Sequence, residues 1–402
     1  MSDIEAGDPR DIDAAGVLDV LVVGAGPGGL YAAARLARDG HRVLVCEEHE
    51  NVGDPVHCTG IIAADSFDEF DLPRDVILNA LDRVRFVSPS GNPITYTTSR
   101  SEAVVIDRGR FDRMLADRAR ASGAAIWTGT RVLGLTIDEH GARATAGNRA
   151  VRARLVVLAC GASYGVQRRS RLGIPGQYLH TAQREVPARR LHDVEMHFGR
   201  DIAPGGFAWA VPVARPEGAH VRVGVMASHD PLGHFRRMMD RVRGPWGVQL
   251  EEVRPRLKIL PLAVIARTYA TRLLAVGDAA GLVKPTTGGG IYYSILSGSL
   301  AADVGSSALR RDALDARSLA VYESTWRTRL SREFDAQQEL RRIAIGMSDA
   351  DIDALFELAR TDGVIPLMRK TARFNEHRHL IRALFNHRPA RRILFRSLAG
   401  CT

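Results

Sequence analysis

The clearest chemical pattern in the sequence is a cluster of glycines followed by two acids. The cluster reads Gly24-Ala-Gly-Pro-Gly-Gly29, with glycines at Gly24, Gly26, Gly28 and Gly29. In such a cluster the first glycine permits a tight turn, the second lets the backbone approach a pyrophosphate, and the last lets a helix pack closely on a strand. Glu47 and Glu48 stand 23 and 24 residues after Gly24, near the spacing of an acid that accepts hydrogen bonds from ribose hydroxyls. The pattern predicts a dinucleotide site.

A second glycine pattern lies far along the chain. Residues 272–281 form an apolar run that stops at Gly277-Asp278, and further glycines precede an expected helix. This pattern resembles the flavin-binding Gly-Asp motif. The resemblance implies that Asp278 binds a ribityl chain, and that backbone N–H groups and a helix N-terminus lie where negative charge grows on the reduced flavin. The residues assigned to this motif are Gly277, Asp278, Gly281, Gly289, Gly290 and Ile291. Two glycine motifs together favour FAD over NAD.

These motifs need an α/β framework to position them. The expected elements are strands at 17–23, 42–46, 103–108, 155–161 and 272–281, and helices at 30–38 and 110–122. The first strand, the glycine turn, the first helix and the second strand form a βαβ unit that ends in an acid. The sequence therefore predicts an α/β protein with a Rossmann-type FAD-binding domain.

The pattern of the chain changes after residue 165. Residues 166–266 contain alternating segments, such as 206–212 and 220–226, which predict an inserted antiparallel sheet. From Ala302 onward helical periodicity dominates, and Ser348 is the expected N-cap of a helix over 349–360. The predicted organisation is a loose tail over 1–16, an FAD-binding domain over 17–85, 103–165 and 267–310, a β-rich substrate domain over 86–102 and 166–266, and a helical region over 311–402.

Composition is that of an ordinary globular protein. The chain has 402 residues, 45% apolar and 25% charged, which excludes collagen-like, coiled-coil and wholly disordered chains. The N-terminus is acidic where a secretory signal is basic, and no window approaches the length of a membrane span, so a cytoplasmic location is expected. The four cysteines show neither pairing nor metal-ligand spacing, so we expect no disulfide framework and no metal site.

Nearly all of the net charge of +9 lies near the C-terminus. Between Arg369 and Arg396 there are nine basic residues and one acid, Glu376. An apolar stripe runs among the arginines at Leu380, Ile381, Leu384 and Phe385. The stripe predicts either an interfacial helix on the inner face of a membrane or, as we prefer, a helix packed on its own domain. The sequence shows no known nucleic-acid-binding module, so nucleic acid is not an expected partner.

Taken together, the motifs resemble those of the geranylgeranyl reductase family, within the p-hydroxybenzoate-hydroxylase-like group of flavoproteins. The shared segments outside the glycine motifs are Val52-Gly-Asp-Pro-Val-His-Cys-Thr-Gly60, Asp107-Arg108 before Phe111-Asp112, Phe207-Ala-Trp-Ala-Val-Pro212 and Met347-Ser-Asp-Ala-Asp. The resemblance implies an FAD enzyme that reduces carbon–carbon double bonds in an isoprenoid chain on a lipid or related prenyl substrate. It also implies that Arg108 lies against the cofactor, whereas the residue by itself fits a surface pair with Asp107.

Alkene reduction needs a hydride at one carbon and a proton at the other, so the site needs a proton donor beside the flavin. The resemblance supplies Cys58, with His57 next to it, as the catalytic candidate, and places Cys58 among the cofactor contacts. A prenyl chain offers apolar surface and few hydrogen bonds, so its tunnel should be apolar. The expected lining residues are Phe207, Trp209, Pro212, Tyr292 and Tyr293.

The chief alternative is a flavin monooxygenase, or a halogenase-like enzyme, acting on an aromatic or polyketide-like molecule. Halogenases of the group carry a W-x-W-x-I-P motif that looks like the segment 209–212, but position 207 is Phe here. Hydroxylases generally keep an acid where this chain has Cys160, and this departure disfavours them. A non-catalytic flavin or prenyl-lipid binder is a further alternative. The sequence shows no second dinucleotide motif, so the electron donor is either NADPH or a ferredoxin, and the oligomeric state stays open.

Overall fold

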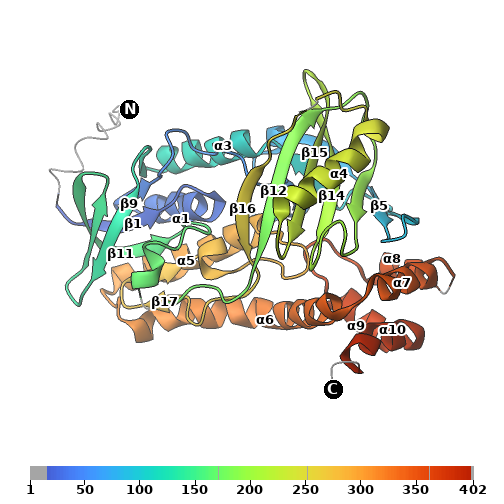
Figure 1. Cartoon of the computed structure of the whole chain (residues 1–402). Coiled ribbons are helices and arrows are strands. Elements are labelled where there is room, and N and C mark those ends of the chain that lie inside the picture. The colour runs from blue at the N-terminus through green and yellow to red at the C-terminus, as the bar shows by residue number, and fades with distance from the viewer. Residues whose placement is uncertain (1–15, 171, 251, 362, 400–402) are drawn as a thin grey trace.

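The computed structural model describes residues 16–170, 172–250, 252–361 and 363–399. Apart from Gly16, the expected tail over 1–16 lies outside the described residues. Figure 1 shows two β-rich halves side by side above a long helix, α6, that runs beneath both of them. The C-terminal helices gather at the end of α6 that lies under the second half.

The first half is built on the expected parallel sheet. Its strand order is β17-β18-β11-β1-β2-β8, and only the β17–β18 pair is antiparallel. The bounds are β1 Leu18–Val23, β2 Val43–Cys46, β8 Ala125–Trp127, β11 Arg149–Leu158, β17 Tyr269–Ala270 and β18 Leu273–Ala275, with β9 Val132–Ile137 and β10 Ala142–Ala146 extending β11 as an antiparallel ribbon. Val23 pairs with Cys46 on one side and Leu158 on the other, so the three central strands end at one edge.

Three helices pack on this sheet, α1 Pro27–Arg38, α3 Arg108–Ala121 and α5 Ile291–Arg310. Alanines and leucines form the buried face of α1, which lies against both α3 and α5. The approach of α1 to α5 is close, because a Cβ atom on Gly298 would lie 2.2 Å from the backbone oxygen of Gly28. Both helices begin at the edge where the central strands end.

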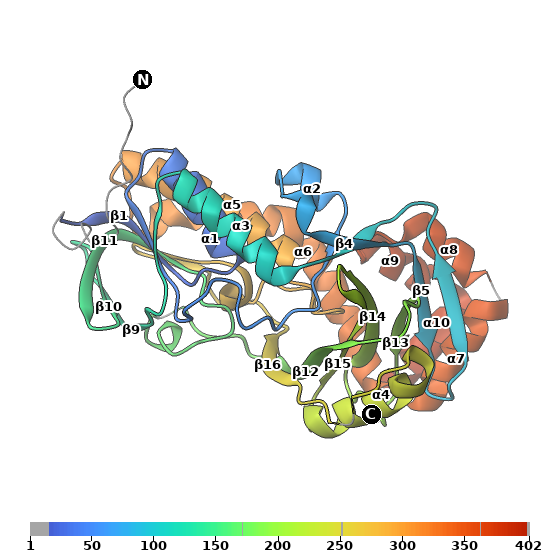
Figure 2. The ribbon, with the colours of Figure 1, turned by 90° about the horizontal axis from the view of Figure 1, so that it is seen from above.

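The second half is a seven-stranded sheet with the order β16-β12-β15-β14-β13-β5-β6. Its bounds are β5 Arg83–Val87, β6 Pro93–Thr97, β12 Tyr178–Pro187, β13 Val194–His197, β14 Phe207–Arg215, β15 Gly218–Ala227 and β16 Arg256–Pro261. Every pair is antiparallel except β13 with β5. The helix α4 Pro231–Trp246 covers one face and buries Phe235, Met238 and Trp246 there. Figure 2 shows α4 on the side of this sheet away from the rest of the molecule.

A small antiparallel sheet lies between the two halves. It has the order β3-β7-β4, with β3 Ile61–Ala63, β4 Ile77–Leu81 and β7 Ala103–Ile106, and the short helix α2 Ser66–Glu69 follows β3. The strand expected at 103–108 therefore forms, but in this connecting sheet. The α/β fold class with an inserted antiparallel sheet is confirmed.

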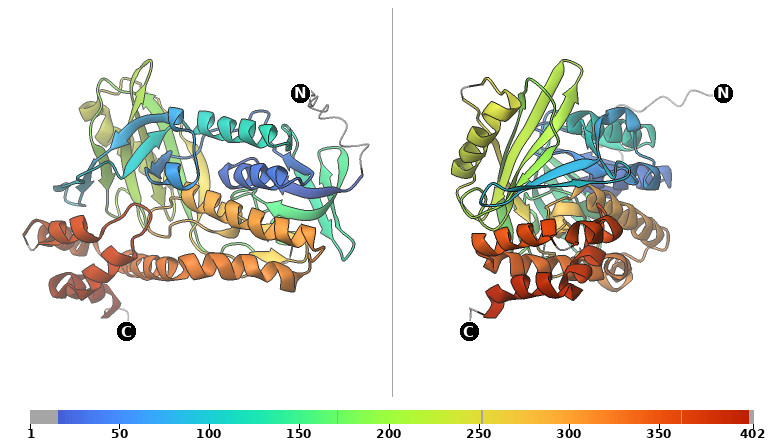
Figure 3. Two further views of the ribbon diagram at one scale, coloured as in Figure 1. Left: turned by 180° about the vertical axis from the view of Figure 1, so that it is seen from behind. Right: turned by 90° about the vertical axis from the view of Figure 1, so that its right-hand side faces the viewer.

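The C-terminal region is helical, as expected. Its helices are α6 Ala316–Gly346, α7 Asp349–Thr361, α8 Val364–Thr371, α9 Arg378–Asn386 and α10 Arg388–Ala399. Ser348 caps α7 as predicted, because its Oγ accepts a hydrogen bond from the Asp351 N–H and the Asp351 carboxylate accepts one from the Ser348 N–H. Leu384 and Phe385 of the apolar stripe pack in one cluster with Ile343 and Leu394, so α9 packs on α6 and α10 (Figure 3). Of the helices that the structure describes, none has the length and apolar character of a membrane span.

Candidate active site

One large cavity, of about 750 Å³, lies where the two halves meet, and we call it the central cavity. Its wall combines the carboxyl edge of the parallel sheet, the first turns of α1 and α5, and one face of the seven-stranded sheet. A cavity of this size can enclose most of a large organic ligand. The two glycine motifs, at 24–29 and 277–291 in the sequence, both reach it.

The first glycine motif forms one end of the cavity. Gly24 has a φ of +103°, and a Cβ atom there would lie 2.4 Å from the Ala159 backbone oxygen, so this turn requires glycine. A Cβ atom on Gly26 would meet nothing within 4 Å, because this residue faces open space in the cavity. Gly28 instead lies against α5, where a Cβ atom would be 2.5 Å from the Ser294 backbone oxygen. Gly29 packs on Gly24, in the helix–strand contact expected of it.

Glu47 lies at the end of β2 and faces the glycine turn. One carboxylate oxygen accepts a hydrogen bond from the Ala25 N–H at 2.8 Å, and the other accepts one from the His49 N–H at 3.0 Å. Glu48 also lines the cavity and pairs with Arg131 at 3.3 Å. Glu47 therefore has a fixed position at the place where an acid of this fold binds ribose hydroxyls.

The second glycine motif forms the opposite part of the wall. Asp278 lines the cavity, and a Cβ atom on Gly290 would lie 3.0 Å from its carboxylate. Gly289, Gly290 and Ile291 line the cavity at the start of α5. Gly277 and Gly281 do not line it; they have positive φ and pack against Ser294 and Ala263. These two glycines shape the turn that presents Asp278.

The wall fits a dinucleotide cofactor such as FAD. Neither α1 nor α5 has a side-chain cap at its N-terminus, and both N-termini face the central cavity. Uncapped helix N-termini offer backbone N–H groups and a positive dipole end to an anion. A pyrophosphate would fill the free space at Gly26. The carboxylates of Glu47 and Asp278 would accept hydrogen bonds from ribose and ribityl hydroxyls.

Cys58 lines the central cavity between the glycine motifs and the seven-stranded sheet. Its Sγ atom accepts a hydrogen bond from the Gly60 N–H at 3.3 Å and contacts the guanidinium of Arg108. The Arg108 side chain is 11% exposed and binds both oxygens of Asp112, at 2.7 and 2.9 Å. Burial alone would lower the pKa of Arg108, but Asp112 and Cys58 raise it above its ordinary value.

The alternative interpretation of Arg108, a surface residue paired with Asp107, is wrong. Arg108 lines the cavity, whereas Asp107 caps α3 through the Arg110 N–H at 2.9 Å and binds Arg215. The partner of Arg108 is Asp112, one helical turn later. This pair places a fixed cation beside the sulfur of Cys58.

His57 lines the cavity but is not a charged acid near neutral pH. Burial lowers its pKa to about 4, and the cations of Lys258 and Arg256 act in the same direction. The imidazole is therefore neutral at pH 7 and has no imidazolium proton to donate. Cys58 is the better placed of the two catalytic candidates.

The apolar part of the wall comes from the seven-stranded sheet. Phe207 and Trp209 line the cavity with their rings 5.8 Å apart, and Val211 follows them on the same face of β14. The Trp209 ring lies over Gly224 of β15, where a Cβ atom would be 2.3 Å from it. Pro212 lies on the other face because side chains alternate along a strand, and it does not line the cavity.

Neither tyrosine of α5 borders the cavity, contrary to expectation. Tyr292 points toward α2 and α6, where its hydroxyl accepts a hydrogen bond from Arg329 at 2.8 Å. Tyr293 is buried, and its hydroxyl donates to the Asn375 backbone oxygen at 2.8 Å. Ser294, the next residue, is the one that lines the cavity.

The structure adds cavity residues that the sequence did not single out. Lys284 lies between the two parts of the second glycine motif, is fully buried, and donates to the Phe374 backbone oxygen. Phe374 and His377, from the segment before α9, line the cavity beside it. Burial lowers the pKa of Lys284 to about 7. The position of Lys284 inside a glycine motif was a usable signal, but nothing in the sequence pointed to Phe374 or His377.

Several curated relatives share one name with each other and align with most of this chain. The digeranylgeranylglycerophospholipid reductase of Methanocaldococcus jannaschii is 31% identical over 85% of this chain and 90% of its own length. The chain belongs to the geranylgeranyl reductase family. A second member, from Methanospirillum hungatei, is 31% identical over 84% of this chain and 88% of its own. The chain also belongs to the family whose model is described as lycopene cyclase protein, which matches residues 19–361.

Solved structures agree on the fold of this family member. A geranylgeranyl bacteriochlorophyll reductase-like protein from Thermoplasma acidophilum superposes with a TM-score of 0.81, at 24% identity, over 96% of this chain and 99% of that one. The myxobacterial chondrochloren halogenase, a variant of the FAD-dependent halogenases, superposes with a TM-score of 0.63, at 19% identity, over 96% and 97% of the two chains. At these identities the likeness concerns the fold, which reductases and halogenases of this kind share.

Proposed function

We propose that the protein is an FAD-dependent reductase that hydrogenates carbon–carbon double bonds in a geranylgeranyl-type isoprenoid chain carried on a lipid. One observation carries this proposal. A single cavity joins two uncapped helix N-termini, a cysteine with its own cation, and an apolar strand face. The relatives named for digeranylgeranylglycerophospholipid support this class of substrate.

Different residues of the cavity wall would bind different parts of FAD. The N–H groups at the start of α1 would bind the pyrophosphate, Glu47 the ribose and Asp278 the ribityl chain. The first turn of α5 would stabilise negative charge at the flavin end. Bound FAD supplies the hydride for the reduction.

Cys58 would supply the proton that the second carbon of the alkene needs. The Sγ–H bond breaks as a new C–H bond forms, and the negative charge stays on sulfur. The Gly60 N–H and the Arg108 guanidinium both face that sulfur, and donors of this kind stabilise a thiolate. Asp112 keeps the guanidinium in place. A proton from solvent water then restores the thiol.

The seven-stranded sheet would bind the isoprenoid chain, so we propose it as the substrate domain. Phe207, Trp209, Val211 and Met226 give the cavity an apolar wall suited to a branched hydrocarbon. The same wall keeps water from the reacting carbons, which favours hydride transfer over side reactions.

The basic C-terminal region is the proposed contact with the membrane that holds the lipid. Eight of its nine basic side chains are exposed, at Arg369, Lys370, Arg373, Arg382, Arg388, Arg391, Arg392 and Arg396. Such a cluster attracts anionic headgroups on the cytoplasmic surface.

We expect the protein to co-sediment with anionic vesicles, and we expect this binding to weaken several-fold when Arg388, Arg391 and Arg392 are changed to Ser. Equal binding to neutral vesicles would contradict an electrostatic contact with the membrane.

The deciding experiment is the accurate mass of the product. The purified flavoprotein, reduced chemically without oxygen, is mixed with a geranylgeranyl lipid, and a parallel aerobic sample receives NADPH and candidate aromatics. Gain of hydrogen pairs in the lipid supports the proposal. An unchanged lipid with oxygen or halogen added to an aromatic would instead establish the rival activity. Anaerobic bleaching of the flavin by NADPH or by a ferredoxin identifies the electron donor.

A further inference from the structure

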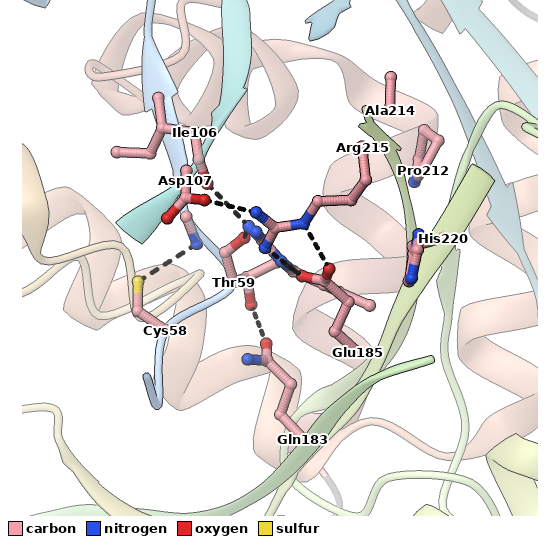
Figure 4. Close-up of polar contacts among 12 residues, drawn as sticks. Cys58, Thr59, Ile106, Asp107, Gln183, Glu185, Pro212, Ala214, Arg215 and His220 are labelled. Atoms are coloured by element: carbon pink, nitrogen blue, oxygen red, sulfur yellow. Dashed lines mark hydrogen bonds and ion pairs between the residues drawn. The ribbon is translucent and has the colours of Figure 1, made fainter. Parts of the chain in front are cut away.

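A buried arginine from the seven-stranded sheet reaches across to the loop that carries Cys58. Arg222 lies in β15 and is only 2% exposed. Its guanidinium donates to the Glu185 carboxylate of β12 at 2.7 Å, to the Thr59 backbone oxygen at 2.5 Å and to the Ile106 backbone oxygen at 3.1 Å. Figure 4 labels its three partners, Thr59, Ile106 and Glu185, which lie close together between the loop, β7 and the sheet. One side chain therefore joins three segments that are distant in the sequence.

Both carbonyl groups belong to segments that position Cys58 and Arg108. Thr59 directly follows Cys58, and Ile106 lies two residues before Arg108. Gly60, whose N–H donates to the Cys58 sulfur, has a φ of +69°, and a Cβ atom on it would lie 2.6 Å from the Arg222 guanidinium. The close fit at Gly60 leaves this loop little freedom beside Arg222.

The charge of Arg222 is compensated within the protein. Glu185 accepts hydrogen bonds from Arg222 and also from Arg215, at 2.7 and 3.1 Å, and Arg215 reaches on to Asp107. Burial alone would raise the pKa of Glu185, but the two arginines lower it below its ordinary value. A paired, hydrogen-bonded arginine of this kind keeps one orientation, and a lysine cannot reproduce its planar set of donors.

We propose that Arg222 is a positioning residue that holds Cys58 against Arg108. The inference rests on the proposed function, in which Arg108 stabilises the sulfur left by proton donation. Arg222 acts through the backbone, because it binds the carbonyl of Thr59, next to Cys58, and the carbonyl of Ile106, two residues before Arg108. Loss of Arg222 would thus uncouple Cys58 from Arg108 without removing either.

The test is a double-mutant cycle on the reactivity of Cys58, which needs no isoprenoid substrate. The probe is iodoacetamide on the purified flavoprotein, with alkylation of the Cys58 peptide followed by mass spectrometry. We expect Arg108→Gln to slow this alkylation by about tenfold in the otherwise native protein, because the sulfur loses its cation. In the Arg222→Lys background, we expect Arg108→Gln to change the rate by less than about twofold. A tenfold effect in both backgrounds would overturn the proposal.

Arg215→Gln is the matched control, because Arg215 binds the same carboxylate but donates to no backbone carbonyl of the loop. The tenfold effect of Arg108→Gln on the alkylation rate should persist in the Arg215→Gln variant. Its loss there would show that any disturbance of this ion-pair network has the same effect, which would overturn a specific role for Arg222. Glu185→Gln is the second variant, for use if Arg222→Lys does not fold. It leaves Arg222 in place with a weaker partner, so the Arg108 effect should fall to about threefold, and an unchanged effect would again overturn the proposal. If the wild-type protein does not reduce a prenyl lipid but Arg222 and Arg108 are still coupled in the alkylation rates, the result would count against the proposed reaction and not against the role of Arg222.

Discussion

Cys58 is the residue on which the proposed chemistry depends most directly. Cys58→Ala removes the proposed proton source and leaves both glycine motifs unchanged in sequence. We expect the variant to retain its flavin and to reduce a prenyl lipid about a hundredfold or more slowly, which is the usual contribution of a positioned acid. Single-turnover kinetics of the pre-reduced protein, with flavin content measured in parallel, tests this. Full activity with full flavin content would remove Cys58 from the mechanism.

Lys284 predicts a dependence of stability on pH. Burial lowers its pKa from 10.5 to about 7. Between these values the unfolded chain binds a proton on this amine and the folded protein does not, so the free energy of unfolding rises with pH across this window. We expect Lys284→Met to flatten the rise, by at most several kcal/mol between pH 7 and 10. Identical pH profiles of the thermal midpoint for the two proteins would contradict the burial of this amine.

At the residue scale, the sequence predicted which residues line the central cavity better than it predicted the pairs they form. The positions of the glycines and acids in the two motifs depend on the local backbone, so their spacing in the sequence was sufficient to predict them. The partner of Arg108 depends on where its helix begins: Asp107 proved to be the N-cap, and Asp112 lies one turn along the same face as Arg108. A neighbouring charge in the sequence was a poor guide to a partner in space.

At the scale of the element, the start of α1 allows a sharp comparison of two glycines. Gly26 faces open cavity space, whereas Gly28 touches α5. Gly26→Leu should lower the affinity for FAD by at least tenfold and leave the melting temperature of the apoprotein nearly unchanged, because its side chain would occupy the pyrophosphate space. Gly28→Ala should lower that melting temperature, since overpacking of this kind costs about 1–3 kcal/mol. Flavin fluorescence titration and calorimetry of both apoproteins separate the two effects, and a reversed ranking would refute this placement of the cofactor.

The elements themselves were predictable where their periodicity was strong, as in β1, α1 and the capped helix α7. The direction of each side chain was less so. Tyr292 and Tyr293 follow the glycines at the first turn of α5, but the rotation of that helix turns both away and brings Ser294 to the cavity. The strand β7 was found at its expected position, yet its sheet is set by pairing with β3 and β4, which no local pattern encodes.

At the scale of the molecule, the C-terminal region supplies part of the cavity wall through Phe374 and His377. Buried Glu333 of α6 accepts hydrogen bonds from the backbone N–H groups of His377 and Arg378 and from the Gln337 side chain. Glu333→Ala would leave these donors without a partner, which costs about 1–3 kcal/mol for each buried group. We expect a melting temperature lower by several degrees and faster loss of flavin on gel filtration. A variant as stable as the parent, with unchanged flavin retention, would show that α6 does not hold this wall.

Long-range contacts were the part that the sequence could not supply. Arg222 meets partners 163 and 116 residues away in the sequence, and Lys284 meets Phe374 across 90 residues. Such pairs depend on how the two halves and the helices are arranged, and no spacing rule reaches that far. The fold class and the cofactor motifs could be predicted from the sequence. The long-range contacts of Arg222 and Lys284 could not.

The residues that line the central cavity extend from Val23 to His377, so the wall draws on most of the chain. During translation, the first glycine motif leaves the ribosome long before the segment that completes the wall. An N-terminal fragment that ends before residue 374 lacks Phe374 and His377, which are part of this wall. We therefore expect firm retention of FAD to come late in biogenesis, and nascent chains stalled short of this point should release it readily.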